Sequence, residues 1–302
     1  MNFLISTILI LISVAFYTIL ERKILGYMQT RKGPNKVSIM GILQPLSDAL
    51  KLFNKMLIPT EMMNYSLSYL TPALSLFTSM MMISIIPFNL FSSFDIKHSI
   101  LMFFVISSLS VYFILMIGWS ANSKFSFLGS IRGVAQMISY EVSFFLILLF
   151  MVILSHSYSF TEISKSQTFL YFIYGNSILF LIWTTSCLAE TNRSPFDFAE
   201  GESELVSGFN VEYMGGWFAL IFLAEYLNML ILSIMSIILF MKSLNSPMSS
   251  LMMIMMTIIL LWIRGTLPRF RYDMLMNLSW KIFLPISLFL IPIPMIISLL
   301  SS

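Results

Sequence analysis

Long apolar stretches alternate along this chain of 302 residues with shorter segments that carry most of its charge. Eight stretches have about the length that a helix needs to cross a bilayer, since a helix rises about 1.5 Å per residue and the hydrocarbon core is about 30 Å thick. Strands of a membrane barrel would be shorter and would alternate apolar with polar residues. The predicted spans are residues 3–20, 67–88, 100–121, 134–154, 169–189, 217–241, 248–263 and 282–300. The last contains Pro285, Pro292 and Pro294, so a kinked helix is expected there.

Composition supports this all-α, polytopic membrane class. Hydrophobic residues make up 58% of the chain and charged residues only 10%, far outside the range of soluble domains. The single Cys187 and the isolated His98 and His156 exclude a disulfide, a zinc site or an iron-sulfur cluster built by this chain. The chain opens directly into an apolar stretch without a basic leader, so we expect that stretch to be retained as a span. We treat residues 1–302 as a single membrane domain that binds no metal or prosthetic group.

Basic residues predict the orientation of the spans. The segments that join spans 1 to 2, 3 to 4, 5 to 6 and 7 to 8 carry 14 of the 17 Lys and Arg residues, whereas the alternate segments carry only Lys97, Lys165 and Lys242. Short basic loops stay on the side from which a membrane protein is inserted. We therefore expect the four basic segments on the inner side and both termini on the outer side, which agrees with an even number of spans.

The first inner loop, residues 21–66, contains an amphipathic pattern. Leu46, Leu50, Phe53 and Leu57 recur at steps of three or four residues, and Asp48 falls on another face. This pattern predicts a helix that lies in the membrane interface. A helix packed on the spans without a functional role fits the same periodicity.

The inner loop between spans 5 and 6, residues 190–216, is rich in carboxylates. Ser194 and Pro195 form an N-terminal signal, and they predict a helix over residues 195–206. Glu190, Asp197, Glu200, Glu202 and Glu204 lie in or next to this helix. Such crowding raises the pKa of some carboxyl groups, which could then exchange protons near neutral pH. A solvated acidic loop is the other interpretation, although interleaved Phe, Leu and Val residues favour a buried one.

Two further acids lie inside predicted spans. Glu141 is the eighth residue of span 4 and Glu225 the ninth of span 6, and both spans start from the inner side. Their carboxylates should therefore lie about 10 to 13 Å below that surface, where they could face each other. Ionisable groups inside a membrane are costly and by default mark a functional site, although a structural hydrogen-bonded role is the alternative. Glu190, at the end of span 5, would connect this pair to the acidic loop.

Motifs for independent catalysis are missing from the sequence. It contains no glycine-rich phosphate loop, dinucleotide fingerprint, nucleophile triad or haem ligand pair. The loop at residues 264–273 is basic and aromatic, but in so apolar a chain it indicates orientation or a partner surface rather than nucleic-acid binding. Any electrons for redox chemistry must therefore come from another subunit.

Four sequence blocks resemble a known family. ERKILGYMQTRKGPN (21–35), QPLSDALK (44–51), AETNRSPFDFAEGESELVSGFNVEY (189–213) and WIRGTLPRFRYD (262–273) are similar to the subunit 1 family of respiratory NADH:ubiquinone oxidoreductase, complex I. The resemblance extends over the whole chain. Its composition and missing targeting peptide resemble an organelle-encoded member, which implies a multi-pass protein of the mitochondrial inner membrane.

The resemblance implies a function in quinone reduction and proton pumping. It implies that span 1, span 6 and the amphipathic helix frame a ubiquinone entrance, that ubiquinone is the substrate, and that FMN and the iron-sulfur clusters belong to partner subunits. The partners would be hydrophilic quinone-module subunits on the matrix side, neighbouring membrane subunits and lipids. Spans 2 to 6 would form half of an antiporter-like unit. The implied proton path comprises Glu141, Glu190, Asp197, Glu200, Glu202, Glu204 and Glu225, and the implied quinone-chamber residues are Arg22, Arg31, Asp48, Arg193, Arg269 and Arg271.

Other classes share some of these features. The membrane subunit of a hydrogenase would have similar spans but no quinone reduction, and the intact block at residues 21–35 argues against it. A stand-alone cation transporter would also carry acids in its spans but would work when purified alone. A purely structural anchor would leave Glu141 and Glu225 unexplained.

Overall fold

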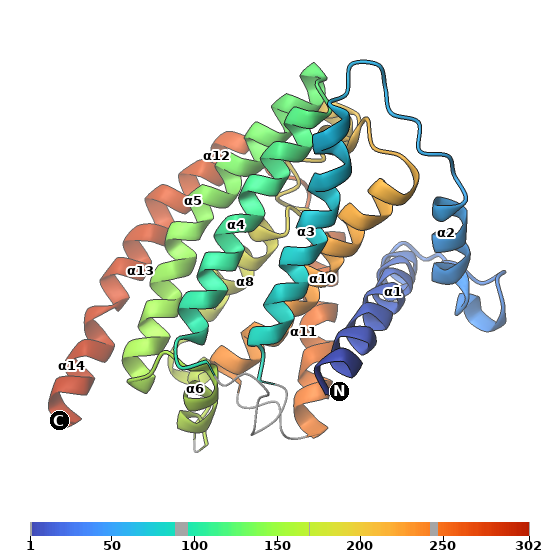
Figure 1. The fold of residues 1–302 in the computed structure, drawn as a ribbon. Helices are drawn as coiled ribbons and strands as arrows, with labels where there is room; N and C mark the ends of the chain where they lie inside the picture. The colour runs from blue at the N-terminus through green and yellow to red at the C-terminus, as the bar shows by residue number, and fades with distance from the viewer. Residues whose placement is uncertain (1, 88–95, 169, 242–246, 302) are drawn as a thin grey trace.

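The computed structural model describes residues 2–87, 96–168, 170–241 and 247–301, and within these ranges the chain forms helices and connecting loops without strands (Figure 1). The all-α prediction is therefore confirmed for the described part of the chain. The helices are α1 (Asn2–Met28), α2 (Gln44–Phe53), α3 (Tyr65–Ile85), α4 (Ser99–Ser120), α5 (Lys124–Ser155), α6 (Phe160–Ser166), α7 (Phe172–Gly175), α8 (Ser177–Glu190), α9 (Glu202–Leu205), α10 (Gly215–Phe240), α11 (Pro247–Thr266), α12 (Tyr272–Asn277), α13 (Leu284–Leu290) and α14 (Pro292–Ser301). Short 3-10 turns lie at Ile39–Gly41 and Gly208–Asn210, and a π-helical turn at Leu278–Phe283 joins α12 to α13.

Seven of the described helical segments are long and apolar enough to cross a membrane. They are Leu4–Met28, Tyr65–Ile85, Ser99–Ser120, Lys124–Ser155, Gly215–Phe240, Met248–Thr266 and Tyr272–Leu299. Each overlaps one of the predicted spans, which leaves only the fifth apolar stretch without a helix of that length.

The fifth stretch is not one continuous helix. Phe169 lies outside the described residues, and the part that follows is divided at Asn176, whose φ of −128° and ψ of 44° are not helical. Gly175 and Asn176 both have low helix propensity, which explains the break. The remaining helix α8 has 14 residues, or about 21 Å of length, which is too short to cross the hydrocarbon core alone.

Helices α1, α5 and α11 extend beyond the apolar stretches that predicted them. Helix α5 begins at Lys124, ten residues before its predicted start, so Glu141 lies deeper in its helix than the expected eighth position. Helix α1 extends to Met28, so Glu21 and Arg22 are helical rather than part of a loop. Helix α11 extends to Thr266 and includes Arg264, which makes the short seventh span 20 residues long. Hydropathy predicts where an apolar stretch ends, not where a helix ends. The backbone hydrogen bonds of a helix can continue through charged residues until a glycine, proline or capping residue ends it.

The long helices form one bundle around an apolar core. Helix α3 packs on α4 and α10, α5 packs on α4 and α8, and α1 lies along α10 and α11. The core between them contains fully buried side chains such as Trp183, Phe144 and Met235. In Figure 1, α1 begins and α14 ends at the lower end of the bundle, whereas the α4–α5 connection lies at the upper end. The C-terminal segment is divided at Ile291, before Pro292, where the proline lacks an amide hydrogen for the helix.

Candidate functional site

A cavity of about 280 Å³ lies between α1, α2 and α10. Its wall is mainly apolar, and its polar members are Thr18, Arg22, Asp48 and Tyr226. The Arg22 Nη1 atom lies 2.8 Å from Asp48 Oδ2, so an ion pair joins α1 to α2 at the edge of the cavity. These are the three elements that were expected to frame a ligand entrance, and the structure brings them together.

Helix α2 presents its apolar stripe outward. Leu46 and Leu50 are 61% and 65% exposed, whereas Pro45, Ala49 and Leu52 face the cavity. Leu57 lies beyond the end of the helix at Phe53, so the stripe is shorter than predicted. Leu46 and Leu50 therefore face away from the cavity, whereas Phe53, the next member of the predicted stripe, lines it.

A buried ion pair that sequence reasoning missed lies beside this cavity. Glu21 is 5% exposed, forms a salt bridge with Arg264, and accepts a hydrogen bond of 2.7 Å from the Tyr226 hydroxyl. Hydropathy had assigned Glu21 and Arg264 to loops. The available signal was the absence of a helix-ending residue directly after residues 20 and 263. A helix that continues past those points carries Glu21 and Arg264 with it, so both side chains stay beside the bundle.

Arg193 lies on the other side of the Tyr226 ring. Its guanidinium carbon is 4.7 Å from the ring centroid of Tyr226 and 5.9 Å from that of Phe222, both within cation–π range. Its Nη2 atom is 3.0 Å from Glu225 Oε2, and the residue is only 4% exposed. Burial lowers the pKa of Arg193, but the carboxylates around it, Glu225 first, outweigh burial and raise that pKa. Arg193 therefore keeps its positive charge next to the cavity wall.

The acidic loop that contains Arg193 folds differently from the prediction. Residues 195–201 are irregular, and the only helix in the segment is α9, so the predicted helix over residues 195–206 is wrong. Tertiary partners take the backbone carbonyls that a helix would use. Phe270 N–H donates to Pro195 O, the Gln136 side chain donates to Phe196 O, and Phe209 N–H donates to Ala199 O. Phe196 and Phe198 are buried, which anchors the loop against the bundle.

Three carboxyl groups gather around Arg193. Asp197 and Glu200 come from the loop and Glu225 comes from α10, and all three interact electrostatically with the guanidinium. Glu200 and Glu225 are close enough to share a hydrogen bond, which requires one proton between the two carboxyl groups. Asn210 donates to Glu200 Oε1 at 2.9 Å. Burial raises the pKa of Glu200 to about 7, against the opposing effect of Arg193, so this group can exchange a proton near neutral pH.

A second cavity, of about 50 Å³, connects this cluster to Glu190. Glu190 and Glu225 both line it, together with Asn192 and Asn228. Glu141 lies close enough to interact electrostatically with Glu190. Glu225 thus pairs with Arg193, and the acid near Glu141 is Glu190, an arrangement different from the expected pairing of Glu141 with Glu225.

Glu204 and Arg269 are more exposed than the cluster around Arg193. Glu204 is exposed and forms a salt bridge of 2.6 Å with Arg132, and the side chain of Glu202 lies outside the described residues. Arg269 contacts Asp197 at 3.4 Å. Among the described residues no group of three His, Cys, Asp or Glu side chains is arranged to hold a metal ion.

Arg31 and Arg271 are exposed and lie away from the cavity between α1, α2 and α10. Arg31 lies on the surface just after α1, and Arg271 forms a local ion pair of 3.1 Å with Asp273. The structure therefore does not bring these two side chains to the cavity.

Comparison with known proteins identifies the family. A family model described as NADH dehydrogenase matches residues 1–294. The chain is 51% identical over 286 residues to NADH-ubiquinone oxidoreductase chain 1 of Anopheles gambiae, with 94% of this chain and 91% of that protein covered. It is 48% identical to the protein of that name from Locusta migratoria, covering 95% and 92%, and 47% identical to that from Phyllostomus elongatus, covering 94% and 92%. The chain therefore belongs to the NADH dehydrogenase family, among the NADH-ubiquinone oxidoreductase chain 1 proteins.

Proposed function

We propose that this chain is a core membrane subunit of a proton-pumping NADH:ubiquinone oxidoreductase. It binds ubiquinone in the cavity between α1, α2 and α10, and it passes the resulting charge changes to the buried carboxyl groups. One observation carries the proposal: Tyr226 lines the cavity with one part of its side chain and holds Arg193 on its ring face, and Arg193 in turn pairs with Glu225. The family membership of the chain supports the same assignment.

The cavity has the chemistry that a quinone needs. A quinone combines a small polar ring with an apolar tail, and the cavity combines an apolar wall with polar groups at Arg22, Asp48 and Tyr226. Its volume is at the lower end of the range for small-molecule pockets, which suits a ring rather than a complete tail. FMN and iron-sulfur clusters in partner subunits supply the electrons, and Arg31, Arg269 and Arg271 complete the chamber where those subunits join this chain.

The proposed proton path begins at the acidic loop. Asp197, Glu200, Glu202 and Glu204 exchange protons at its inner end, and Glu200 shares a proton with Glu225. The 50 Å³ cavity has room for more than one water, since about 10 to 15 Å³ suffices for each. Waters in it link Glu225 to Glu190, and Glu190 interacts with Glu141.

The orientation in the membrane is part of the proposal. Helices α7 and α8 cross the bilayer together as the eighth span, and both termini lie on the outer, intermembrane-space side of the mitochondrial inner membrane. Residues 21–66 and 190–216 then form matrix loops that meet the hydrophilic quinone-module subunits. Leu46 and Leu50 of α2 lie in the membrane interface among lipids, which accounts for their exposure. Neighbouring membrane subunits cover the remaining apolar faces.

Replacement of Glu225 tests the coupling in the assembled complex. Glu225→Gln keeps the size of the side chain but removes the charge opposite Arg193. We expect NADH oxidation by ferricyanide, which needs no quinone, to continue at the wild-type rate, whereas proton translocation per electron during quinone reduction falls. Glu162→Gln is the matched control because Glu162 forms an exposed ion pair with Lys165 in α6, away from the cluster. Full retention of proton translocation by Glu225→Gln refutes the proposed path.

A photoreactive short-chain ubiquinone tests the binding site. We expect it to label residues of α1, α2 or α10 that line the cavity, and we expect excess ubiquinone to suppress the labelling. Labelling elsewhere on the chain with equal competition would refute this location of the quinone. Quinone-linked activity of the same preparation also separates the proposal from a hydrogenase membrane subunit.

A further inference from the structure

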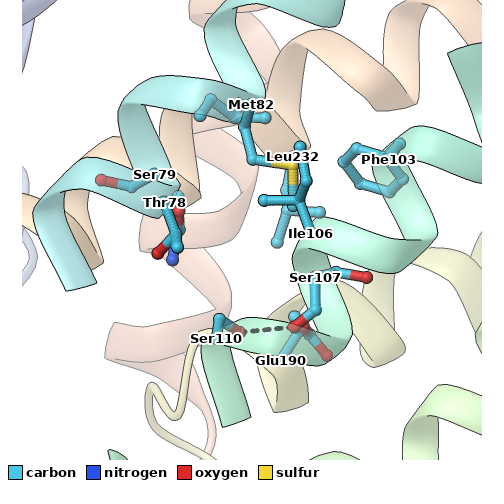
Figure 2. A pocket seen from close by; sticks show the side chains of 11 residues that line it. Thr78, Ser79, Met82, Phe103, Ile106, Ser107, Ser110, Glu190 and Leu232 are labelled. Atoms are coloured by element: carbon cyan, nitrogen blue, oxygen red, sulfur yellow. Dashed lines mark hydrogen bonds between the residues drawn. The ribbon is translucent and has the colours of Figure 1, made fainter. Parts of the chain in front are cut away.

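A third cavity lies directly next to Glu190, between α3, α4 and α10 (Figure 2). Its volume is about 20 Å³, which is enough for a single water molecule. Glu190 lines both this cavity and the larger one that it shares with Glu225. The small cavity is therefore a continuation of the acidic route, and its far wall determines where that route ends.

The wall changes from polar to apolar in one direction along all three helices. On α3, Thr78 is followed one turn later by Met82, and on α10 Asn228 is followed one turn later by Leu232. On the antiparallel α4, Ser110 lies near Glu190, and Phe103 lies about 10 Å farther along the axis. Figure 2 shows the polar group around Glu190 and the apolar group on the opposite side of the cavity.

The polar half of the cavity is suited to hold a water. Each hydroxyl donates its hydrogen to a carbonyl of its own helix: Thr78 to Ser75 at 2.9 Å, Ser107 to Phe104 at 2.8 Å, and Ser110 to Ser107 at 2.6 Å. The hydroxyl oxygens then face the cavity as acceptors. Asn228 and a protonated Glu190 supply donors, so a water here finds the two to four polar partners that it needs.

The apolar half is closed. Phe103, Leu232 and Met82 are 1%, 5% and 7% exposed. Beyond them the side chains of α3, α4 and α10 join the main apolar core, which contains Ile86 and Met235. An apolar constriction excludes water. Without a chain of waters, a proton cannot pass through it.

We propose that the small cavity is a dead-end water site, and that Met82, Phe103 and Leu232 form an apolar plug that prevents protons at Glu190 from leaking to the outer side. The proposal rests on the proposed proton path, because it assigns the barrier at the end of that path. Protons that reach Glu190 are then retained in this subunit until they return toward Glu141 or Glu225.

A nearly isosteric replacement within the plug tests the barrier. Met82→Gln keeps the length of the side chain but adds an amide that can bind water inside the plug. Met81→Gln is the matched control because Met81 is the preceding residue of α3 and is 41% exposed. The assembled complex is reconstituted in vesicles, a pH difference is imposed without NADH, and proton entry is followed with an enclosed pH-sensitive dye.

We expect Met82→Gln to admit protons at least about twice as fast as Met81→Gln, with quinone reduction retained. Adding Glu190→Gln to Met82→Gln should return the rate to that of the control, because protons then lack the group from which they enter the cavity. Leu232→Asn provides a second opening of the plug on another helix if Met82→Gln does not assemble.

Two results would overturn the plug. One is a proton leak that is equal in the Met82→Gln, Leu232→Asn and Met81→Gln complexes. The other is a leak through Met82→Gln that persists when Glu190 is replaced. Either result leaves the proposed function intact as long as Glu225→Gln still lowers proton translocation, so the two proposals fail separately.

Discussion

Replacing Glu200 by glutamine should remove a titration that is centred near neutral pH. The Glu200 carboxyl group faces Arg193, Asp197 and Glu225 and accepts a hydrogen bond from Asn210. A glutamine side-chain oxygen can still accept the bond from Asn210, so the local geometry should persist. The change that remains is the loss of an ionisable group with a pKa of about 7.

The structure gives the size of this effect. Burial is the largest cause of the rise in the pKa of Glu200 from 4.5 to about 7, and Arg193 opposes it. One pKa unit corresponds to about 1.4 kcal/mol, so ionising Glu200 in the folded protein carries a penalty of about 3 kcal/mol. Because Glu200 shares a proton with Glu225, the titration near neutral pH belongs to this carboxyl pair rather than to Glu200 alone.

The sign of the stability effect follows from proton binding. Between about pH 4.5 and 7 the folded protein binds more protons at Glu200 than the unfolded chain does, so its stability decreases as pH rises through this window. The Glu200→Gln variant carries no such penalty. The variant should therefore resist thermal inactivation better than the wild type at pH 8, and this difference should disappear toward pH 5.

The assay is the rate of quinone reduction and the number of protons translocated per electron, both measured in vesicles from pH 6 to 8.5. We expect Glu200→Gln to lose the component of the pH profile centred near 7 and to translocate fewer protons per electron. Glu162→Gln is the comparison because Glu162 is exposed, pairs with Lys165 and lies outside the proposed path. An unchanged pH profile with full proton translocation in Glu200→Gln would refute the assignment of Glu200 to the path.

Further replacements test the groups around the cavity and the loop. Glu21→Gln leaves Arg264 without its anionic partner, and the loss of one member of a buried pair typically costs about 3 to 5 kcal/mol, so the complex should inactivate at a lower temperature. Tyr226→Phe removes a hydrogen bond of about 1 kcal/mol but keeps the aromatic ring, and steady-state kinetics should show a higher KM for quinone with little change in kcat. Gly208→Ala places a Cβ atom 1.7 Å from Ala199 O at a φ of 59°, so the yield of assembled complex should drop sharply.

The apolar pattern predicts the existence of the long helices but not where they end. The seven long apolar helices overlap predicted spans because length and apolar composition alone suit a helix for a membrane, even where, as in Leu4–Met28, few of its residues are buried in the bundle. Their ends depend on signals that hydropathy does not contain. Helix α1 continues through Glu21 because a salt bridge with Arg264 offsets the burial of the carboxylate. The fifth stretch breaks at Asn176 because local backbone preference outweighs its apolar composition.

The sequence indicated which residues are candidates for the site, but it did not indicate which residues they contact. Carboxylates in or beside an apolar chain marked the candidate site. Glu190 and Glu225 line one small cavity, and Glu200 and Glu225 lie around Arg193. The path of the loop was not predictable, because its carbonyls bond to Gln136 and Phe270, which are distant in the sequence. The N-terminal signal at Ser194 and Pro195 therefore predicted a helix that does not form, because hydrogen bonds to distant residues replace those within a helix.

Arg193 gives the proposed coupling a physical basis. With Asp197, Glu200 and Glu225 all ionised, the three carboxylates would exceed the charge of Arg193 by two. Arg269, beside Asp197, and the proton shared by Glu200 and Glu225 each reduce this excess by one. Coulomb energies are large in a buried site, so a new negative charge in the quinone cavity would pull the guanidinium toward the cavity side of the Tyr226 ring. Its hold on Glu225 would weaken, and the proton affinity of the carboxyl pair would rise. Quinone reduction would in this way draw a proton into the cluster without any contact between quinone and carboxylate.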